Sequence, residues 1–438
     1  MAISIPHTPN LAALVVLLPL FSGASAYAED SGRWRINGYG TLGFNVDNSP
    51  TTAFVRDLNQ RPKDSLPDDG AWFSNDAWLR DSRLGLQIGY QFTPTLSAMT
   101  QLVWRDQITT TFSHYVDWAY LAYKPKPEAD IRLGRLGYDV FLMSEQRHLG
   151  YGYPWARPPV EFYGWIPLYA VDGVDLAYTL AGNPERWRFK TQIGRSIGIG
   201  IPMDEEVYSL ESDRLLTATL TRESGPWLIK AGYSHLNIRT EAKPLAPLHP
   251  ALDAVGELGL PGVSAEAANY RRNMRFKDAE MAFRTLGISY DDKEWLVQAE
   301  AGTVTSSIEM NVNNDMAYAG LSRRLGDWTP YLMVGAIRPH VDVYTAAANW
   351  GEGLPPEVAE GLNGLQSAAI TALNSSRIHQ ETLTLGLRWD FDSRAAVKWQ
   401  WDTTHIHPNS YLLRPGFFID RSQDMTVQSF TVNLDFMF

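Results

Sequence analysis

The chain has 438 residues, a formal net charge of −11 and no cysteine. The acidic balance argues against nucleic acid as a partner, and a chain without cysteine has no disulfide, thiolate nucleophile or thiolate-bound metal. Phe, Trp and Tyr make up 12% of the residues, an excess that aromatic rings gathered at two membrane interfaces would explain.

The N-terminus has the pattern of a secretory signal peptide, residues 1–28. An apolar run at residues 11–21 precedes small residues, and Ala26-Tyr27-Ala28 fits the small-x-small cleavage pattern, with Ala24-Ser25-Ala26 as the alternative. The mature chain would be residues 29–438. Beyond this segment no run approaches the ~20 apolar residues of a spanning helix. A membrane-spanning chain of this kind must form a closed β-barrel, because lipid offers no partner to loose backbone groups.

An alternation of apolar and polar side chains, the period of a β-strand, runs from Trp34 to Val46. A long polar connection follows at residues 47–82, and then two alternating runs flank a tight turn at residues 93–95. Short connections recur at residues 124–130, 181–185, 222–226, 291–294, 324–327 and 390–393, and long ones at 106–114, 137–172, 195–214, 235–282, 303–315, 338–380 and 403–425.

This rhythm predicts sixteen strands joined by seven short turns and eight long loops, as an even-stranded barrel requires. A soluble β-sandwich also alternates and is the alternative. The strands near residues 115–124 and 281–290 are poorly phased, so their inward faces are left open. In the seventh loop, apolar residues recur every three or four positions from Val358 to Leu373, which predicts a short amphipathic helix.

The last nine residues, 430–438, alternate strictly and place apolar side chains at every even position up to Phe438. A terminal amphipathic strand that ends on an aromatic residue resembles the last strand of Gram-negative outer-membrane β-barrels. The resemblance implies that this strand pairs with the first one and that Phe438 carries the signal for barrel assembly.

Over its mature length the chain resembles the bacterial porin superfamily, in its sixteen-stranded general-diffusion form. The resemblance implies an all-β fold: a transmembrane antiparallel β-barrel in the outer membrane, with long extracellular loops and short periplasmic turns. It also implies a non-enzymatic, water-filled channel for passive diffusion of small hydrophilic solutes and ions. A homotrimer, contacts with lipid and lipopolysaccharide, insertion by the barrel-assembly machinery and the lack of a cofactor are implied as well.

Two alternatives to a general-diffusion channel stay open. One is a substrate-specific channel in which the barrel holds a solute-binding track. The other is a plugged barrel that acts as an enzyme or an adhesin.

The third loop, residues 137–172, is the most informative connection. Its core, residues 151–165, is dense in aromatic rings and holds three prolines, whereas solvated loop tips are usually small and polar. It resembles the loop that folds into the lumen of general-diffusion porins and narrows it. The alternative is an ordered loop that covers the mouth without entering. Its candidate constriction residues are Asp139, Glu145, Arg147, Arg157 and Glu161.

The wall opposite this loop is expected to be basic. Arg35, Arg83, Arg105 and Arg132 share the inward phase of the first, second, third and fifth strands. Because guanidinium groups stay ionised at physiological pH, they would face the loop carboxylates with permanent positive charge. The predicted consequence is a field across the constriction and a modest preference for anions.

Three other patterns favour no chemistry. Residues 38–43 match the dinucleotide motif G-x-G-x-x-G, but they lie inside an alternating strand rather than between a strand and a helix. His405-Ile406-His407 is at most half of a metal site, because no third ligand is evident. No G-x-S-x-G is present, and the remaining histidines adjoin loops. The sequence therefore predicts no catalytic residue and no bound metal.

Overall fold

The computed structural model describes residues 33–48, 57–58, 60, 77–78, 80–107, 111–166, 168–196, 200–203, 206–209, 211–410 and 422–438. The predicted signal peptide, residues 1–28, and its cleavage site lie outside the described residues.

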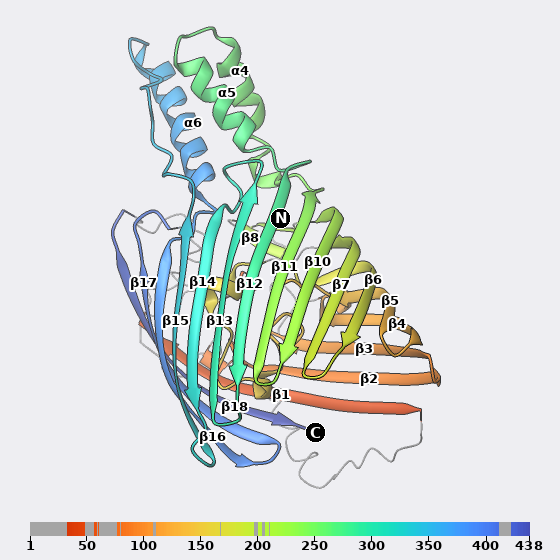
Figure 1. Ribbon diagram of the computed structural model, residues 1–438. Coiled ribbons are helices and arrows are strands. Elements are labelled where there is room, and N and C mark those ends of the chain that lie inside the picture. Colours follow the sequence, from red (N-terminus) through yellow and green to blue (C-terminus); the bar gives the residue numbers. More distant parts are fainter. Residues whose placement is uncertain are drawn as a thin grey trace.

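Within these ranges sixteen strands close into one antiparallel β-barrel, as the sequence predicts (Figure 1). Neighbours in the barrel are neighbours in the chain, and the last strand pairs with the first. The strands are β1 (Trp34–Asp47), β2 (Arg83–Thr93), β3 (Leu96–Arg105), β4 (Val116–Lys126), β5 (Ala129–Gly137), β6 (Ala170–Ala181), β7 (Glu185–Ser196), β10 (Ser212–Ser224), β11 (Trp227–Ile238), β12 (Glu280–Asp291), β13 (Trp295–Ser306), β14 (Asn314–Arg323), β15 (Trp328–Pro339), β16 (Gln380–Asp392), β17 (Ala395–Ile406) and β18 (Met425–Met437).

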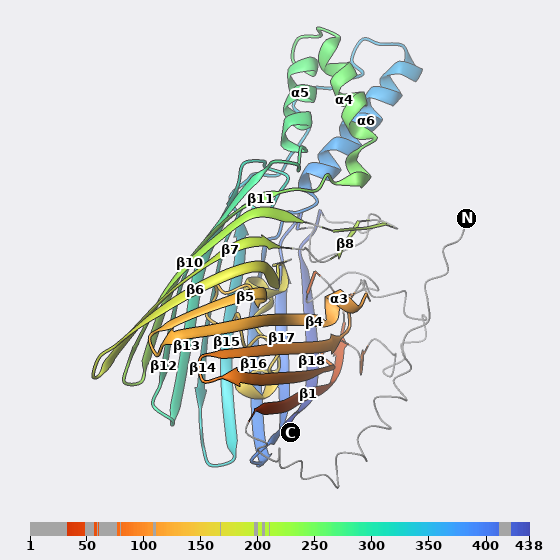
Figure 2. The ribbon, with the colours of Figure 1, turned by 90° about the vertical axis from the view of Figure 1, so that its right-hand side faces the viewer.

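Short turns and long loops alternate and gather at opposite ends of the barrel (Figure 2). The long-loop end carries a separate hairpin, β8 (Gly200–Met203) with β9 (Glu206–Ser209). It also carries the helices α3 (Phe112–Tyr115), η3 (Lys243–Leu245), α4 (Leu248–Glu257), α5 (Val263–Asn273) and α6 (Pro356–Asn374). The helix predicted in the seventh loop is α6. In the described part of the chain, no helix combines the length and apolar character needed to cross a bilayer.

The wall of the barrel is apolar outside and polar inside. Exposed large apolar side chains project outward from most strands, including Ile36, Leu121, Leu133, Leu176, Leu180, Phe189, Ile193, Leu216, Leu286, Leu321, Leu332, Val334, Leu383, Leu385 and Trp401. The buried inward positions are largely polar or charged, among them Gln101, Asp175, Lys190, Gln192, Thr219, Gln298, Glu300, Thr384, Lys398, Gln400, Asp402, Asn433 and Asp435. This arrangement inverts that of a water-soluble protein.

The two poorly phased strands have separate physical explanations. In β4 the register against β3 shifts between the pairs Gln101–Trp118 and Leu102–Val116, so Asp117 is an extra residue that breaks the alternation. In β12 the inward positions Met281 and Phe283 are apolar and fully covered. An apolar inner face removes the polar–apolar contrast from which the phase of a strand is inferred.

Closure of the barrel explains the first two glycines of the G-x-G-x-x-G pattern. Backbone hydrogen bonds of 2.8 and 2.9 Å join Gly38 to Phe438, and Gly40 lies directly opposite Phe436. A Cβ at Gly38 would come within 2.1 Å of the Phe438 ring, and one at Gly40 within 2.4 Å of the Phe436 ring. Gly38 and Gly40 therefore leave room for the rings of Phe436 in β18 and of Phe438 directly after it, and no nucleotide needs to be invoked.

We predict that Gly40→Ala weakens barrel closure, because the new methyl group must displace the Phe436 ring. Overpacking of this kind costs on the order of 1–3 kcal/mol. The measurement is the urea midpoint for unfolding in lipid vesicles, with heat-modifiable migration on a gel as a second readout. The matched control is Gly89→Ala on β2, where the nearest atom is the flexible Met99 methyl group at 3.3 Å. Equal midpoints for the two variants would contradict the packing described.

Candidate functional site

The connection between β5 and β6, residues 138–169, crosses the interior of the barrel and is called loop 3 here. It includes the short helices η1 (Gly150–Gly152) and η2 (Val160–Gly164). Its side chains and backbone contact inward-facing residues on strands from β2 round to β18, and it lies among the strands rather than above them (Figures 1 and 2).

The middle of loop 3 is hydrogen-bonded to β17 and β18. Lys398 donates to the carbonyl oxygens of Gly150, at 2.5 Å, and Trp155, at 2.9 Å, and its ammonium lies 2.8 Å from the Asp435 carboxylate. Asn433 donates to the Ala156 carbonyl at 2.9 Å. Because these wall groups are almost fully buried, the loop backbone supplies the partners that water would otherwise supply.

Arg157 fixes the loop by charge. Its guanidinium donates to both carboxylate oxygens of Asp81, at 3.0 and 2.7 Å, and to Asp402 at 2.8 Å. It also donates to the Thr431 hydroxyl. The planar guanidinium thus joins the segment before β2 to β17 and β18, in a network where each charge is paired.

The two acidic residues at the start of loop 3 bind lysines on the wall. Asp139 pairs with Lys190, at 2.7 Å, and with Lys230, and Glu145 pairs with Lys190 at 3.0 Å. Arg132 lies 3.5 Å from Glu145 and also binds Asp175. Burial opposes ionisation of Asp139, yet the ammonium groups of Lys230 and Lys190 hold its pKa well below the usual range.

Glu161 is bound by neutral donors instead. Gln380 donates to its carboxylate at 2.9 Å, and the Thr382 hydroxyl donates to the same oxygen. Burial raises the pKa of Glu161 above its ordinary value, and the hydrogen bonds from Thr382 and Gln380 offset part of that rise.

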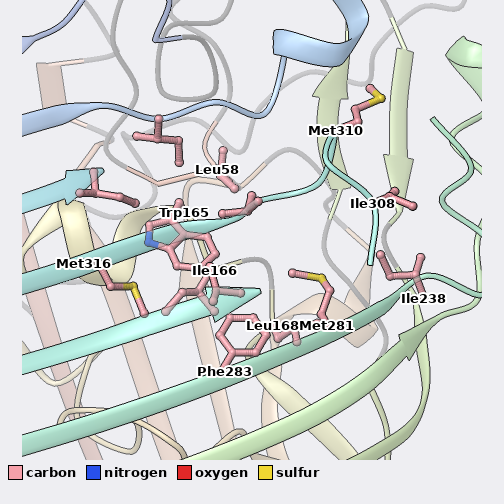
Figure 3. Close-up of a cluster of buried hydrophobic side chains, with 14 of the residues drawn as sticks. Leu58, Trp165, Ile166, Leu168, Ile238, Met281, Phe283, Ile308, Met310 and Met316 are labelled. Atoms are coloured by element: carbon pink, nitrogen blue, oxygen red, sulfur yellow. The ribbon is translucent and has the colours of Figure 1, made fainter. Parts of the chain in front are cut away.

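An apolar cluster holds the far end of loop 3 against the wall. Trp165 stacks on Phe283 of β12, with ring centroids 6.0 Å apart and an interplanar angle of 11°. Figure 3 shows Trp165 and Ile166 beside Met316 and Phe283. All four side chains are at most 2% exposed, so this end of the loop is held by burial of apolar surface.

A group of arginines lies on the other side of the loop, near β2 and β3. Arg83 donates to the His148 carbonyl at 2.7 Å and to the Tyr153 hydroxyl at 3.2 Å. Arg105 and Arg147 stack on the Tyr169 ring, at 4.5 and 3.3 Å from its centroid. Cations this close together repel one another, and contact of both guanidinium groups with the electron-rich ring offsets part of that repulsion.

The arginine group borders a cavity of about 80 Å³, room for several water molecules. Its charged lining residues are Arg80, Arg83, Arg105, Arg147 and Arg157, against Asp57, Asp81 and Asp106. His148 also lines it; burial, with Arg105, Arg147 and Arg83 nearby, lowers the pKa of His148 well below its usual value. The imidazole is therefore neutral, and arginines carry the positive charge of this cavity.

The predicted constriction residues thus lie in separate groups inside the barrel rather than in one constriction. Arg83, Arg105 and Arg147 lie together, Arg132 belongs with the acidic residues and lysines, and Arg35 is exposed near the short-turn end of β1. Asp139 and Glu145 do not face the arginine group across open space, because wall lysines bind them. The charges in the lumen therefore differ in arrangement from the predicted field between an arginine wall and an acidic loop.

Three residues that matter here gave no clear signal in the sequence. Tyr169 lies at the end of the loop, beyond its aromatic core, and receives both arginines only in the fold. Asp81 precedes β2, and Asp117 occupies the β4 bulge, 3.8 Å from His148. A search of the sequence for acidic residues close to the inward-phase arginines would have identified Asp81.

No protein-family model matches the chain, and no curated protein sequence matches it either. Several solved structures do resemble it. An anion-selective porin from Comamonas acidovorans has 11% identity and a TM-score of 0.48, covering 92% of this chain and all of the other. OmpF of Salmonella typhi, in complex with daunomycin, has 12% identity and a TM-score of 0.49, covering 92% and 97%.

The outer membrane channel DcaP of Acinetobacter baumannii has 11% identity and a TM-score of 0.45, covering 93% of this chain and 98% of its own. These similarities are low, so the function is inferred from the side chains of this chain alone.

We predict that Arg157→Ala destabilises the barrel by about 3–5 kcal/mol, because it leaves Asp81 and Asp402 buried without their counter-ion. The measurement is the free energy of unfolding in lipid vesicles, together with protease cleavage within loop 3, which should become faster. The control is Arg186→Ala, whose ion pair with Glu223 is exposed and contributes little. Equal stability of both variants would refute the anchoring role of Arg157.

A second prediction contrasts two carboxylates of loop 3. A raised folded pKa means that folded Glu161 holds its proton at higher pH than the unfolded chain does, so stability falls as pH rises through that window. The pKa of Glu145 is lowered; burial and Asp139 oppose ionisation, but Lys190 and Arg132 outweigh them. Its stabilisation is therefore present above the unfolded pKa and lost in acid.

Glu161→Gln should therefore raise the unfolding midpoint at pH 8 and leave it nearly unchanged at pH 4, whereas Glu145→Gln should lower it at pH 8. Urea titrations at the two pH values make the comparison. A change of the same sign in both variants at pH 8 would contradict the assignment.

Proposed function

We propose that this chain is an outer-membrane channel of the porin type, through which small hydrophilic solutes and ions diffuse passively. The observation that carries the proposal is the inverted wall: exposed apolar side chains cover the outside of a closed barrel, while the inside is polar and charged. A surface of this kind is unfavourable in water and favourable in lipid, where a closed barrel leaves no backbone group unpaired.

The positions of aromatic rings also support a location in a membrane. Three pairs of aromatic rings lie at the strand ends next to the short turns: Trp34 with Tyr90, Trp227 with Tyr290, and Trp328 with Trp389. Amphipathic rings prefer the level of the lipid headgroups, so this end lies at one membrane interface. The resemblance to outer-membrane barrels implies that the short turns face the periplasm and the long loops the cell exterior.

Loop 3 acts as the constriction in this proposal. Its anchors at Arg157, Lys398 and the Trp165 cluster hold it across the lumen, and ions pass beside it rather than displace it. In this proposal the route runs through the cavity beside the arginine group, which has room for several waters. Loop 3 and the strand wall would then together determine the selectivity of the channel for solute size and charge.

The channel favours anions in this proposal. Five arginines against three aspartates line the cavity, and the acidic residues of the opposite cluster are neutralised by lysines. Salt screens charges over roughly 8 Å, so only the groups in the narrowest section select. Three chains per assembly remain an expectation from the resemblance, which chemical cross-linking in the membrane would count.

The test is the reversal potential across a planar bilayer under a salt gradient. We expect anion preference in the native channel and a several-fold lower anion-to-cation permeability ratio in Arg83→Gln with Arg105→Gln. Each charge within about 4 Å of a passing ion contributes about 1 kcal/mol in water-like surroundings. The control is Arg35→Gln, which removes an exposed inward-phase charge at the short-turn end of β1, outside the arginine group. Cation preference that the double substitution leaves unchanged would refute the selectivity proposal.

A further inference from the structure

The outer face of the barrel carries a cluster of histidines and carboxylates at its long-loop end, apart from the lumen. On β16 and β17, even-numbered residues such as Thr384 and Lys398 point inward, so Glu381 and His405 point outward. These two residues are directly opposite each other in the strand pairing. Asp424, just before β18, joins them on the same outer face.

The cluster is built across three neighbouring strands. The His407 backbone N–H donates to the His379 carbonyl at 3.0 Å, which extends the ladder beyond β17 and places the two imidazoles face to face, with centroids 3.9 Å apart. The Asp424 carboxylate oxygen lies 3.7 Å from Nε2 of His405 and 4.0 Å from Nδ1 of His407. The ligand atoms of His405, His407 and Asp424 all lie within 4.8 Å of one another.

These distances are close to those of a metal site. Metal–nitrogen and metal–oxygen bonds of about 2.0–2.2 Å in a tetrahedron place neighbouring ligand atoms roughly 3.3–3.6 Å apart. Two separations are already within about half an ångström of that range, and small rotations of the partly exposed side chains would close the rest. The open side of the cluster leaves a fourth position for water.

A second carboxylate is placed to orient one of the imidazoles. With Nδ1 of His407 directed toward Asp424, its Nε2 lies 3.5 Å from Glu381. Metal-binding histidines almost always donate their other ring N–H to a carboxylate, a backbone carbonyl or water, which fixes the tautomer and makes the ring a better ligand. Glu381 is in the right place for that bond.

We propose that His405, His407 and Asp424 bind a divalent transition-metal ion of the Zn²⁺, Cu²⁺ or Ni²⁺ class, with Glu381 as the orienting carboxylate. Imidazole nitrogen favours these ions, whereas Mg²⁺ and Ca²⁺ prefer sites made of oxygen atoms alone. The bound ion would join β17 to the segment before β18 at the rim of the barrel. The proposal does not depend on solute transport.

The same end of the barrel provides matched comparisons. His235 lies 3.7 Å from Glu280, and His340 lies 2.8 Å from Asp315. Each of these is one histidine beside one carboxylate, an ordinary surface ion pair when the imidazole is protonated. Only the grouping at His405 brings two imidazoles and a carboxylate together, within the ranges that the structure describes.

The experiment is calorimetric titration of ZnCl₂ and, separately, MgCl₂ into the folded protein in detergent, prepared without a histidine tag. We expect one Zn²⁺ per chain and much weaker Mg²⁺ binding. His405→Ala with His407→Ala should weaken Zn²⁺ binding by more than about 100-fold. Glu381→Gln should weaken it by roughly 10-fold, as expected for a residue that orients a ligand without touching the metal. The control His340→Ala should bind Zn²⁺ like the native protein.

Zn²⁺ affinity that the double substitution leaves unchanged, or equal affinity for Mg²⁺, would overturn the proposal. Heat-modifiable migration shows whether each variant is folded. If the double variant does not fold, Asp424→Asn, which lies outside the strands, takes its place. A loss of at least about tenfold in Zn²⁺ affinity supports the site, and an unchanged affinity overturns it.

Discussion

Backbone pairing between β1 and β18 leaves no free strand edge in the wall, and every other feature of the molecule depends on that closure. Gly38 and Gly40 allow the Phe438 and Phe436 rings to lie over the first strand. Once the wall is closed, its two faces meet different surroundings, and alternate residues on each strand must suit one or the other. A closed wall also defines an interior, whose polar groups need partners.

Loop 3 provides many of those partners. Lys398, Asn433 and Gln400 bond its backbone, while Arg157 binds carboxylates on two sides. Buried charges are costly unless they are paired, so the loop and the wall fix each other's conformation. Rigidity at this point matters for a channel, because a loop that moved would change both the width and the charge of the route. Arg83, near Tyr169, is also held by the loop, because it donates to the His148 carbonyl and the Tyr153 hydroxyl.

Much of the fold could be predicted from the sequence, because the two-residue period records the two faces of the wall directly. Arg83 and Arg132, for example, have the inward phase in the sequence, and both contact loop 3 in the interior. Phase says nothing about where a loop goes after it leaves its strand. The partners of Asp139 are therefore lysines that no pattern linked to it, and Asp424 joins His405 and His407 only through the fold. The Asp117 bulge shows a further limit, since one extra residue inverts the phase of the strand residues beyond it.

The inverted wall can be tested most directly with cysteines, because the chain has none of its own. Arg188→Cys and Phe189→Cys change adjacent residues of β7 that point to opposite faces, the lumen and the lipid. The measurement is channel conductance in a planar bilayer before and after a charged, water-soluble methanethiosulfonate reagent is added. A stepwise change in conductance for Arg188→Cys and none for Phe189→Cys is expected. Equal modification of both variants, or a native protein that conducts no ions, would contradict a water-filled barrel in a membrane.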